Sequence, residues 1–483
     1  MLRFKTGRTP SGTAARIFAG LIFIIFAGGL TKRALPEMFA SRPAKDAGIP
    51  GAARIEVILP ATGVAPCSLN VFSTPLAWFD GAVYTVSVEE PSGPDNGIDL
   101  RTFVWKGVRQ KSGKWLWTKK LIENRTLHDR YHTGPSIGID RYGYIHVAYN
   151  MHNMPWQYAV SKRPGDISSF EFRGERLNME ELELVEWKNL TPFARFGTSA
   201  IPGTQITYPA FFNDRYENLY VTYRFATHPG LKWKKRGFAG AIARYDPDKR
   251  SWRALGGRVS VSSGQALLPE GLESSDIAAF AYRDGWSVYL LRLFFDVENH
   301  MHISWLWRKG GAGKDCSDPC YLCSKDSGRT YIGADATEWL PPMHPGQAGV
   351  AQGAVAGKKF YAPAQVTADA VGRPLMLLNP MGLPRILVRP DKEGIWAVAE
   401  NSPRGASAIY IDDAGTKWAF ATGITVFRKN VQTGFKWQTV YSEPSGRFGY
   451  PKILPMPRKK RILVYAQSLD GSQIKIFSIR TGY

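Results

Sequence analysis

The stretch Asp140–Val147, DRYGYIHV, carries the pattern on which the fold prediction depends. Its Asp and Gly residues favour a tight hairpin turn, and the residues that follow alternate between apolar and polar side chains. Such a period of two is typical of a strand that packs one face into a core. The stretch therefore predicts a turn followed by a half-buried strand.

Similar phrases occur along the chain, and several are followed by a Trp-containing strand. The other phrases begin at Asp80, Asp214, Asp284, Asp369 and Asp413. Their spacing of roughly 40–85 residues is irregular, which is typical of propeller blades with insertions. A β-sandwich would have more closely spaced turns. We therefore expect an all-β fold, a single β-propeller over residues 50–483, with seven blades.

Composition agrees with this fold class. The chain has 483 residues, of which 44% are hydrophobic and 21% charged, so it can bury a large core. The 13% aromatic content, with 48 Gly and 32 Pro, favours short strands joined by turns. These values exclude a disordered, a collagen-like and a multi-spanning membrane protein.

The N-terminal segment, residues 1–45, is predicted to direct export. Basic residues precede the uncharged stretch Ile17–Leu30, which is shorter than the roughly 20 residues that span a bilayer. Ala40 is a fair candidate for the end of a cleavage site, and an uncleaved membrane anchor stays open. We expect a periplasmic, secreted or membrane-anchored protein, and a core helix is the alternative interpretation.

Three of the four cysteines crowd into the sequence CSDPCYLC: Cys316, Cys320 and Cys323. With one further ligand, such as His300 or His302, they could hold a structural zinc ion. The alternatives are a disulfide, which an oxidising compartment would permit, and buried thiols. Cys67 stands alone in the sequence.

The segment Ser324–Tyr331, SKDSGRTY, has the S-x-D-x-G-x-T-aromatic pattern. It resembles the Asp box of sialidase-type propellers. That resemblance implies that the Ser and Asp side chains bond the turn backbone while the aromatic ring packs between sheets. It is a marker of the fold and does not indicate a sialidase.

Residues 128–252, which contain HDRYHTGPSIGIDRYGYIHVAYNMHNMPW and TYPAFFNDRYENLYVTYRF, carry the densest chemistry. This region resembles the BNR-4 repeat family, which contains ulvan lyases and related lyases that cleave uronate polysaccharides. The resemblance implies a site that is formed by His132, His152, Tyr208 and Arg224. It also implies that no cofactor is needed for catalysis.

β-Elimination from a uronic acid chain requires these types of residue. The C5 proton is acidic only when the neighbouring carboxylate is neutralised, and a guanidinium does this with two parallel hydrogen bonds, so we assign that role to Arg224. Tyr208 or a histidine would take the C5 proton and the other kind of group would protonate O4. Each histidine alone could be structural, and Tyr208 could be a core aromatic residue. We expect His146, on the opposite face of its strand, to be packed in the core.

The chain departs from the family pattern after Arg224, where it has ATHPGLKWKKRGFAG. Lys232, Trp233 and Lys235 are suited to stacking on sugar rings and attracting an anionic polymer. A solvated surface loop is the alternative. The insertion leaves the identity of the polysaccharide open.

The net charge of +21 favours an acidic partner. For an exported chain we expect an anionic polysaccharide as the substrate of a monomeric lyase, and no nucleic acid, because no nucleic-acid-binding motif occurs. Two alternatives remain. One is a sialidase-like glycoside hydrolase with Tyr208 as nucleophile. The other is a non-catalytic carbohydrate-binding propeller.

Overall fold

A computed structural model describes most of the chain beyond residue 54. The described residues are 55–62, 72–89, 101–123, 132, 134–154, 156–173, 206–226, 237–259, 277–309, 316–350, 357–430, 433–443, 447–471 and 473–481. One compact unit, Ala53–Tyr483, contains them all. These residues form strands and turns and no α-helix, with a short 3-10 turn, η3, at Pro457–Lys459. Within them no helix is long and apolar enough to cross a membrane. The predicted leader, 1–45, lies outside the described residues.

The strands pair into antiparallel sheets that follow one another along the chain. The first two sheets contain β2 (Leu76–Phe79), β3 (Ala82–Glu89), β4 (Arg101–Arg109) and β5 (Trp115–Glu123), then β6 (Ser136–Ile139), β7 (Ile145–Ala148), β9 (Tyr158–Ser161) and β10 (Phe170–Phe172). The next two contain β11 (Ile206–Asn213), β12 (Leu219–Ala226), β13 (Phe238–Asp246) and β14 (Ser251–Ala254), then β17 (Trp286–Phe295), β18 (Met301–Lys309), β19 (Ser317–Ser324), β20 (Tyr331–Ile332) and β21 (Glu338–Trp339). A single parallel pair, Phe238 with Ser287, joins these two sheets, and β8 (His152–Met154) pairs with the free edge of β11.

The remaining sheets complete the order. They contain β22 (Phe360–Ala368), β23 (Pro374–Pro380), β24 (Ile386–Pro390) and β25 (Trp396–Asn401), then β26 (Ala406–Ile411), β27 (Lys417–Ala421), β28 (Thr425–Lys429) and β29 (Gln438–Ser442), then β30 (Lys452–Met456), β31 (Arg461–Gln467) and β32 (Gln473–Arg480). A separate ribbon is formed by β15 (Gly257–Val259) and β16 (Ile277–Ala279). The first described strand, β1 (Ile55–Thr62), pairs antiparallel with β32, so strands from both ends of the unit share one sheet.

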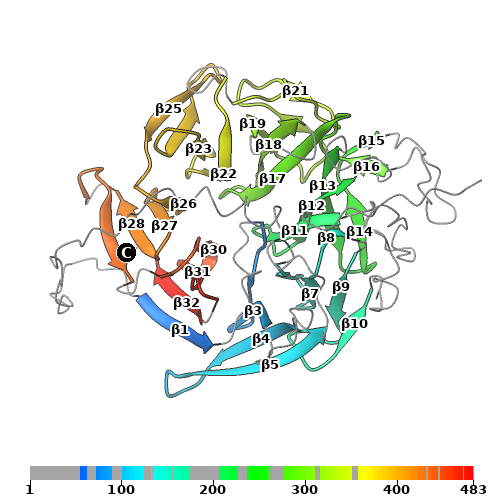
Figure 1. The fold of residues 1–483 in the computed structure, drawn as a ribbon, viewed down its shortest axis with the longest axis vertical. Coiled ribbons are helices and arrows are strands. Elements are labelled where there is room, and N and C mark those ends of the chain that lie inside the picture. The colour runs from blue at the N-terminus through cyan, green and yellow to red at the C-terminus, as the bar shows by residue number, and fades with distance from the viewer. Residues whose placement is uncertain are drawn as a thin grey trace, which may run out of the picture. The chain divides into compact units, whose positions relative to one another are not determined.

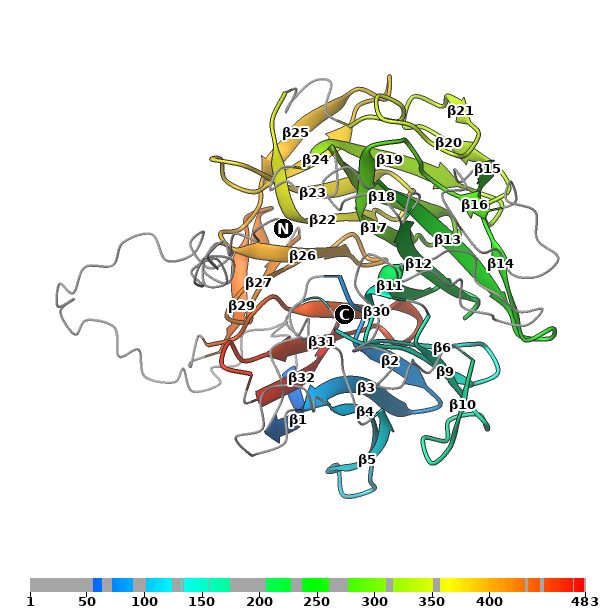
Figure 2. The same ribbon diagram turned by 45° about the vertical axis from the view of Figure 1, so that its right-hand side comes forward.

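The sheets are arranged around a common axis (Figure 1). Figure 2 shows β1 beside β32, where the ring closes. A cavity of about 660 Å³ runs along the axis, and the first strand of each sheet lines it. This arrangement is that of a β-propeller, so the prediction of an all-β propeller is confirmed at the level of fold class.

The core lies between neighbouring sheets and is rich in large side chains. Trp156, Trp305 and Trp307 are each 0% exposed; Trp305 and Trp307 lie on one face of β18, and Leu306 between them packs into the layer on the other face. Because successive side chains point to opposite faces, each sheet can pack against two neighbours. The alternating aromatic and aliphatic residues in the sequence therefore fill two inter-sheet layers.

The Asp turns form as predicted after several first strands. The Asp140 carboxylate accepts the backbone N–H groups of Tyr142 and Tyr144 at 3.0 and 2.9 Å, which closes the β6–β7 turn. Asp214 and Asp369 make the same pair of bonds to the residues two and four positions later. A short acidic side chain thus satisfies the turn N–H groups that have no strand partner.

Two turn predictions were wrong in their position. The carboxylate that closes the β26–β27 turn belongs to Asp412, not Asp413, which instead pairs with Arg215 across the surface. Asp284 precedes the first strand of its sheet, whereas the equivalent turn between β17 and β18 is closed by Asp296. Its sequence, DVENH, has Asn299 in the left-handed conformation, where the Asp140, Asp369 and Asp412 turns have glycine and the Asp214 turn has Glu217. Asn tolerates that conformation, so this turn forms without a glycine.

The predicted Asp box forms between β19 and β20. The Asp326 carboxylate accepts the N–H groups of Arg329 and Thr330, and the Ser324 hydroxyl accepts the N–H of Gly328. The Tyr331 ring is 2% exposed and packs in the core between sheets.

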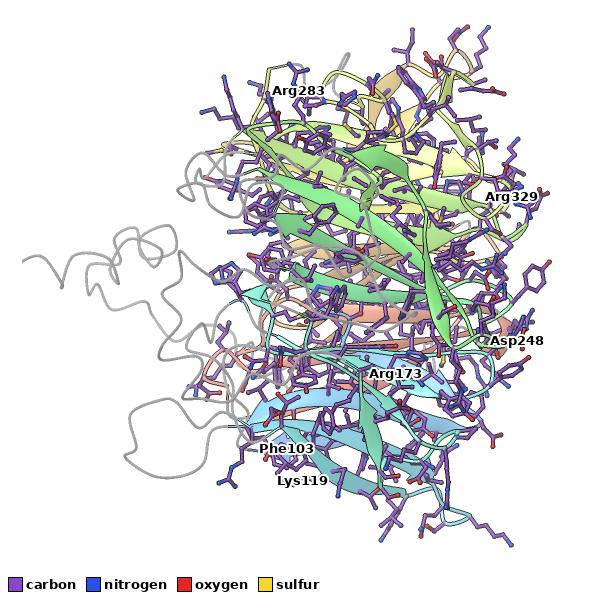
Figure 3. All side chains as sticks on the ribbon, turned by 90° about the vertical axis from the view of Figure 1, so that its right-hand side faces the viewer. Phe103, Lys119, Arg173, Asp248, Arg283 and Arg329 are labelled. Carbon is purple, nitrogen blue, oxygen red and sulfur yellow. The ribbon has the colours of Figure 1, made fainter. Side chains whose placement is uncertain are left out.

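Figure 3 shows Arg329 and Asp248 at one edge of the molecule, which we call the turn face. Arg283, just before β17, lies at the opposite edge.

Candidate functional site

Three of the predicted site residues come from neighbouring strands in one row. Thr207 of β11 is opposite His152 of β8 on one side and opposite Arg224 of β12 on the other. Tyr208 follows Thr207 directly. This row crosses β11 near its beginning, at the end of the strand that is away from the turn face. Pairing of β8 with β11 is therefore what brings His152 next to Tyr208 and Arg224.

The structure brings all four predicted residues together. The rings of His132 and His152 are nearly parallel, with centroids 4.4 Å apart. The Tyr208 ring lies 6.2 Å from that of His132 and 5.8 Å from that of His152. The Arg224 Cζ atom lies 4.5 Å from the centre of the Tyr208 ring. Two imidazoles, one phenol and one guanidinium therefore share one cluster.

Tyr208 has an unusual backbone. Its φ angle is +59°, and the pairing of β11 with β12 shifts between Thr207 and Ala210, so Tyr208 and Pro209 form a bulge. A bulky residue in the left-handed region costs of the order of 1–3 kcal/mol, and such strain concentrates at functional sites. Proline needs no ladder partner, so it fits a bulge.

Contacts from outside β11 hold this bulge in place. The Ser136 hydroxyl donates to the Pro209 carbonyl at 2.6 Å and accepts the N–H of Thr74 at 3.0 Å. Two residues earlier, the Phe72 ring stacks on the Tyr208 ring at 3.6 Å between centroids and 7° between planes. The segment that leads into β2 therefore fixes both the backbone and the ring of Tyr208.

Arg224 is enclosed by aromatic rings. Its Cζ atom lies 4.5, 4.5 and 4.3 Å from the ring centres of Tyr208, Phe238 and Tyr289, and the residue is 6% exposed. Its Nε and Nη1 atoms are buried and have no hydrogen-bond partner among the described residues. No carboxylate in the described part of the chain lies within 4.0 Å of it. A buried cation is costly unless an anion or acceptors compensate it, so Arg224 is suited to receive an anionic group.

A second arginine lies close by, which sequence reasoning missed. The Arg308 Cζ atom is 4.0 Å from the centre of the Tyr289 ring, the ring that Arg224 also contacts. Burial lowers the pKa of Arg308, and the neighbouring positive charge of Arg224 acts in the same direction. Tyr289 and Arg308 are the last residues of DGWSVY and HISWLWR, which show only the alternation of a strand, so no motif marks them as site residues.

The hollow among these residues is small. Its lining includes Phe72, Tyr208, Arg224 and Arg292 and residues of β12 and β17, and its volume of about 20 Å³ is that of one or two water molecules. The segments 124–131, 174–205 and 227–236, which adjoin the site strands, lie outside the described residues. The predicted contacts from Lys232, Trp233 and Lys235 fall in the last of these segments and stay predictions.

His146 has the structural role that we expected. It is 0% exposed, and its Nδ1 atom bonds the Tyr158 hydroxyl while its Nε2 atom is 3.4 Å from Asp140 Oδ2. Burial lowers the pKa of His146, although Asp140 opposes this. The imidazole thus links the turn carboxylate to the core.

The three clustered cysteines do not converge. Cys320 packs in the core on one face of β19, whereas Cys316 and Cys323 pack in the core on the other. Side chains an odd number of positions apart on a strand point to opposite faces, which explains the separation of Cys320 from Cys323. Cys320 and Cys323 are free thiols, and among the described residues no group of three His, Cys, Asp or Glu side chains is placed to hold a metal ion. Burial raises the pKa of Cys323 to about 12, so this thiol stays protonated at neutral pH.

The fold and the cluster together define a β-propeller with a His, His, Tyr and Arg cluster beside the beginning of β11. The family model described as "BNR repeat-containing family member" (BNR_4) matches residues 100–399. The chain therefore belongs to this family, as its sequence resemblance predicted. A search of curated proteins found no match.

Two solved structures share the fold. The polysaccharide lyase Uly1 superposes with a TM-score of 0.54 at 14% identity, over 86% of this chain and 90% of that one. A PL25 ulvan lyase bound to -[GlcA(1-4)Rha3S]- gives a TM-score of 0.56 at 14% identity, over 88% and 95% of the two chains. At this identity the similarity establishes the fold alone.

Proposed function

We propose that this protein is a polysaccharide lyase that cleaves a uronic-acid-containing anionic polysaccharide by β-elimination. The observation that carries the proposal is the Arg224 guanidinium, which is enclosed by three aromatic rings next to the Tyr208–histidine cluster. The fold shared with two polysaccharide lyases agrees with it. We also propose export by residues 1–45, and a propeller of seven blades, because β2, β6, β11, β17, β22, β26 and β30 each contribute to the axial cavity.

In the proposed reaction, Arg224 binds the uronate carboxylate with two parallel charge-assisted hydrogen bonds. This neutralises the charge that would otherwise oppose removal of the C5 proton. Tyr208, His132 or His152 accepts that proton, and the C5–H electron pair forms the C4=C5 double bond as the C4–O4 bond breaks. A second member of the cluster donates a proton to O4. The reaction consumes no water and changes no oxidation state of the protein.

The geometry supports a division of labour between the two sides of the cluster. Tyr208 lies between Arg224 and the two histidines, because its ring is 4.5 Å from the guanidinium carbon and about 6 Å from each imidazole. A carboxylate held by Arg224 would thus place its C5 atom near the phenol. Proton transfer by such positioned groups contributes about 10²–10⁴-fold to a rate.

The test is incubation of the purified protein with a panel of uronate polymers. A rise in ultraviolet absorbance from a 4,5-unsaturated uronate, lost in Tyr208→Phe and kept in Tyr216→Phe, is expected. Tyr216 is a suitable control because it is 64% exposed and lies in the β11–β12 turn. Reducing sugar without unsaturation would indicate a hydrolase instead, and binding without any product would indicate a non-catalytic propeller.

A further inference from the structure

The axial cavity contains charged side chains that the proposed reaction does not use. It is bounded by β2, β6, β11, β17, β22, β26 and β30. Apolar residues such as Val366 and Ile409 form part of its wall. Its volume of about 660 Å³ is sufficient for a ligand with its hydration water.

Two cations lie at the end of this cavity where the first strands begin. Arg292 of β17 donates from Nη2 to the Phe72 carbonyl at 2.9 Å, and Lys452, the first residue of β30, donates from Nζ to the Ser73 hydroxyl at 2.5 Å. Phe72 and Ser73 are consecutive residues. The segment that leads into β2 therefore holds the guanidinium and the ammonium next to each other.

Lys452 has no acidic partner among the described residues. No carboxylate in that part of the chain lies within 4.0 Å of its Nζ atom, and the charge that acts on it is the positive charge of Arg292. Burial, and to a smaller extent the positive charge of Arg292, together lower the pKa of Lys452 to about 7. Burial also lowers the pKa of Arg292, to about 10.

At the turn face the charges near the cavity are either engaged or exposed. The carboxylates of Asp140 and Asp214 accept hydrogen bonds from their own turns, and Arg215 pairs with Asp413. Arg458 and Lys459 also line this end, but they are exposed, whereas Arg292 and Lys452 are partly buried. Charges that are partly shielded from water interact more strongly than exposed ones, which favours binding of an anion beside Lys452.

We propose that the axial cavity binds a small oxyanion, such as sulfate, phosphate or a free carboxylate, between Arg292 and Lys452. Guanidinium and ammonium donors both form strong charge-assisted hydrogen bonds to such oxygens. Arg292 also lines the hollow beside Tyr208, so the bound anion would stabilise the segment Phe72–Thr74 that positions Tyr208. The binding itself does not depend on the proposed lyase activity.

The experiment is a sulfate titration of the whole protein, with chloride used to keep the ionic strength constant. Isothermal calorimetry should give a saturable binding curve for the wild type and a dissociation constant about tenfold or more weaker for Lys452→Met. The control is Arg458→Met, which removes a cation from the turn-face end of the same cavity and should leave binding unchanged. An absence of saturable binding to the wild type, or equal affinity in Lys452→Met, would overturn the proposal.

A second measurement uses only the wild-type protein, so it does not require that Lys452→Met folds. Crystals of the wild type soaked in selenate should give an anomalous peak within hydrogen-bond distance of Lys452 Nζ, and an axial cavity without such a peak would refute the site. Competition with free glucuronate then identifies the source of the anion. If glucuronate displaces sulfate, the natural ligand is a sugar acid. If it does not, the natural ligand is an inorganic oxyanion. Both results require the proposed site.

Discussion

The substitution Arg224→Met separates the proposed role of the arginine from its packing. Methionine keeps an apolar side chain of similar length among the rings of Tyr208, Phe238 and Tyr289 but removes the charge. Two hydrogen bonds from a guanidinium to a carboxylate contribute about 1.5–3 kcal/mol each, so their loss should reduce kcat/KM by roughly 10²–10⁴-fold.

The expected change in stability is much smaller, because two terms oppose each other. Loss of the three ring contacts at 4.3–4.5 Å removes about 0.5–1 kcal/mol each. Removal of the buried Nε and Nη1 groups relieves about 1–3 kcal/mol for each unpaired donor. The free energy of unfolding should therefore stay within about 2 kcal/mol of the wild type, or rise.

The assay follows the initial rate of unsaturated-uronate formation at several polymer concentrations, with chemical denaturation of the same samples. Arg141→Met serves as the control, because Arg141 lies in the β6–β7 turn and pairs with Asp248. Retained turnover in Arg224→Met would refute the role of the arginine. A large loss of stability in parallel with the loss of rate would show that Arg224 is structural.

Three further predictions concern the fold and the leader. The pKa of Asp326 is lowered to about 2. Partial burial opposes this shift, but the carboxylate accepts several hydrogen bonds within the Asp box, of which that from the Thr330 N–H has the largest effect. This pKa is below that of an Asp in the unfolded chain, roughly 3.9, so the ionised carboxylate stabilises the fold above about pH 4 and this stabilisation is lost as the pH falls toward about 2. Asp326→Asn should therefore make the free energy of unfolding less dependent on acid pH, and an unchanged dependence would contradict this. Gly240→Ala would place a Cβ atom 2.7 Å from Val288 Cγ1 and should destabilise the protein by about 1–3 kcal/mol in denaturant unfolding, and an unchanged midpoint would show that β17 can move away. Expression with residues 1–45 in a secreting host should yield exported protein, with Ala40 as the first cleavage site to check by N-terminal sequencing, whereas an intact chain retained in the cytosol would argue against the leader.

The sequence was sufficient to predict the parts of the fold that depend on local chemistry. The Asp turns and the Asp box are built from hydrogen bonds between residues two to four positions apart, so their residue types appear as short motifs. The Asp296 turn has Asn299 in the left-handed conformation and the Asp214 turn has Glu217 there, so neither turn needs a glycine. A search for Asp followed by Gly therefore does not find every turn of this kind.

The site was predictable only where the family resemblance covered it. His152, Tyr208 and Arg224 converge because β8, β11 and β12 pair in one row, a register that no local pattern encodes. Phe72 stacks on Tyr208 from a segment more than 130 positions away and carries no motif. Contacts of this kind join segments that are far apart in the sequence and are fixed by the packing of different sheets, so they could not be read from the sequence.

The central claim is that the polymer is cleaved by elimination and not by hydrolysis. Digestion of a uronate polymer in heavy-oxygen water, followed by mass spectrometry of the products, tests it directly, because elimination adds no water. The account predicts products whose masses sum to that of the substrate and that carry no solvent oxygen. One heavy oxygen atom for each bond cleaved, at the new chain end of one of the two products, would contradict it.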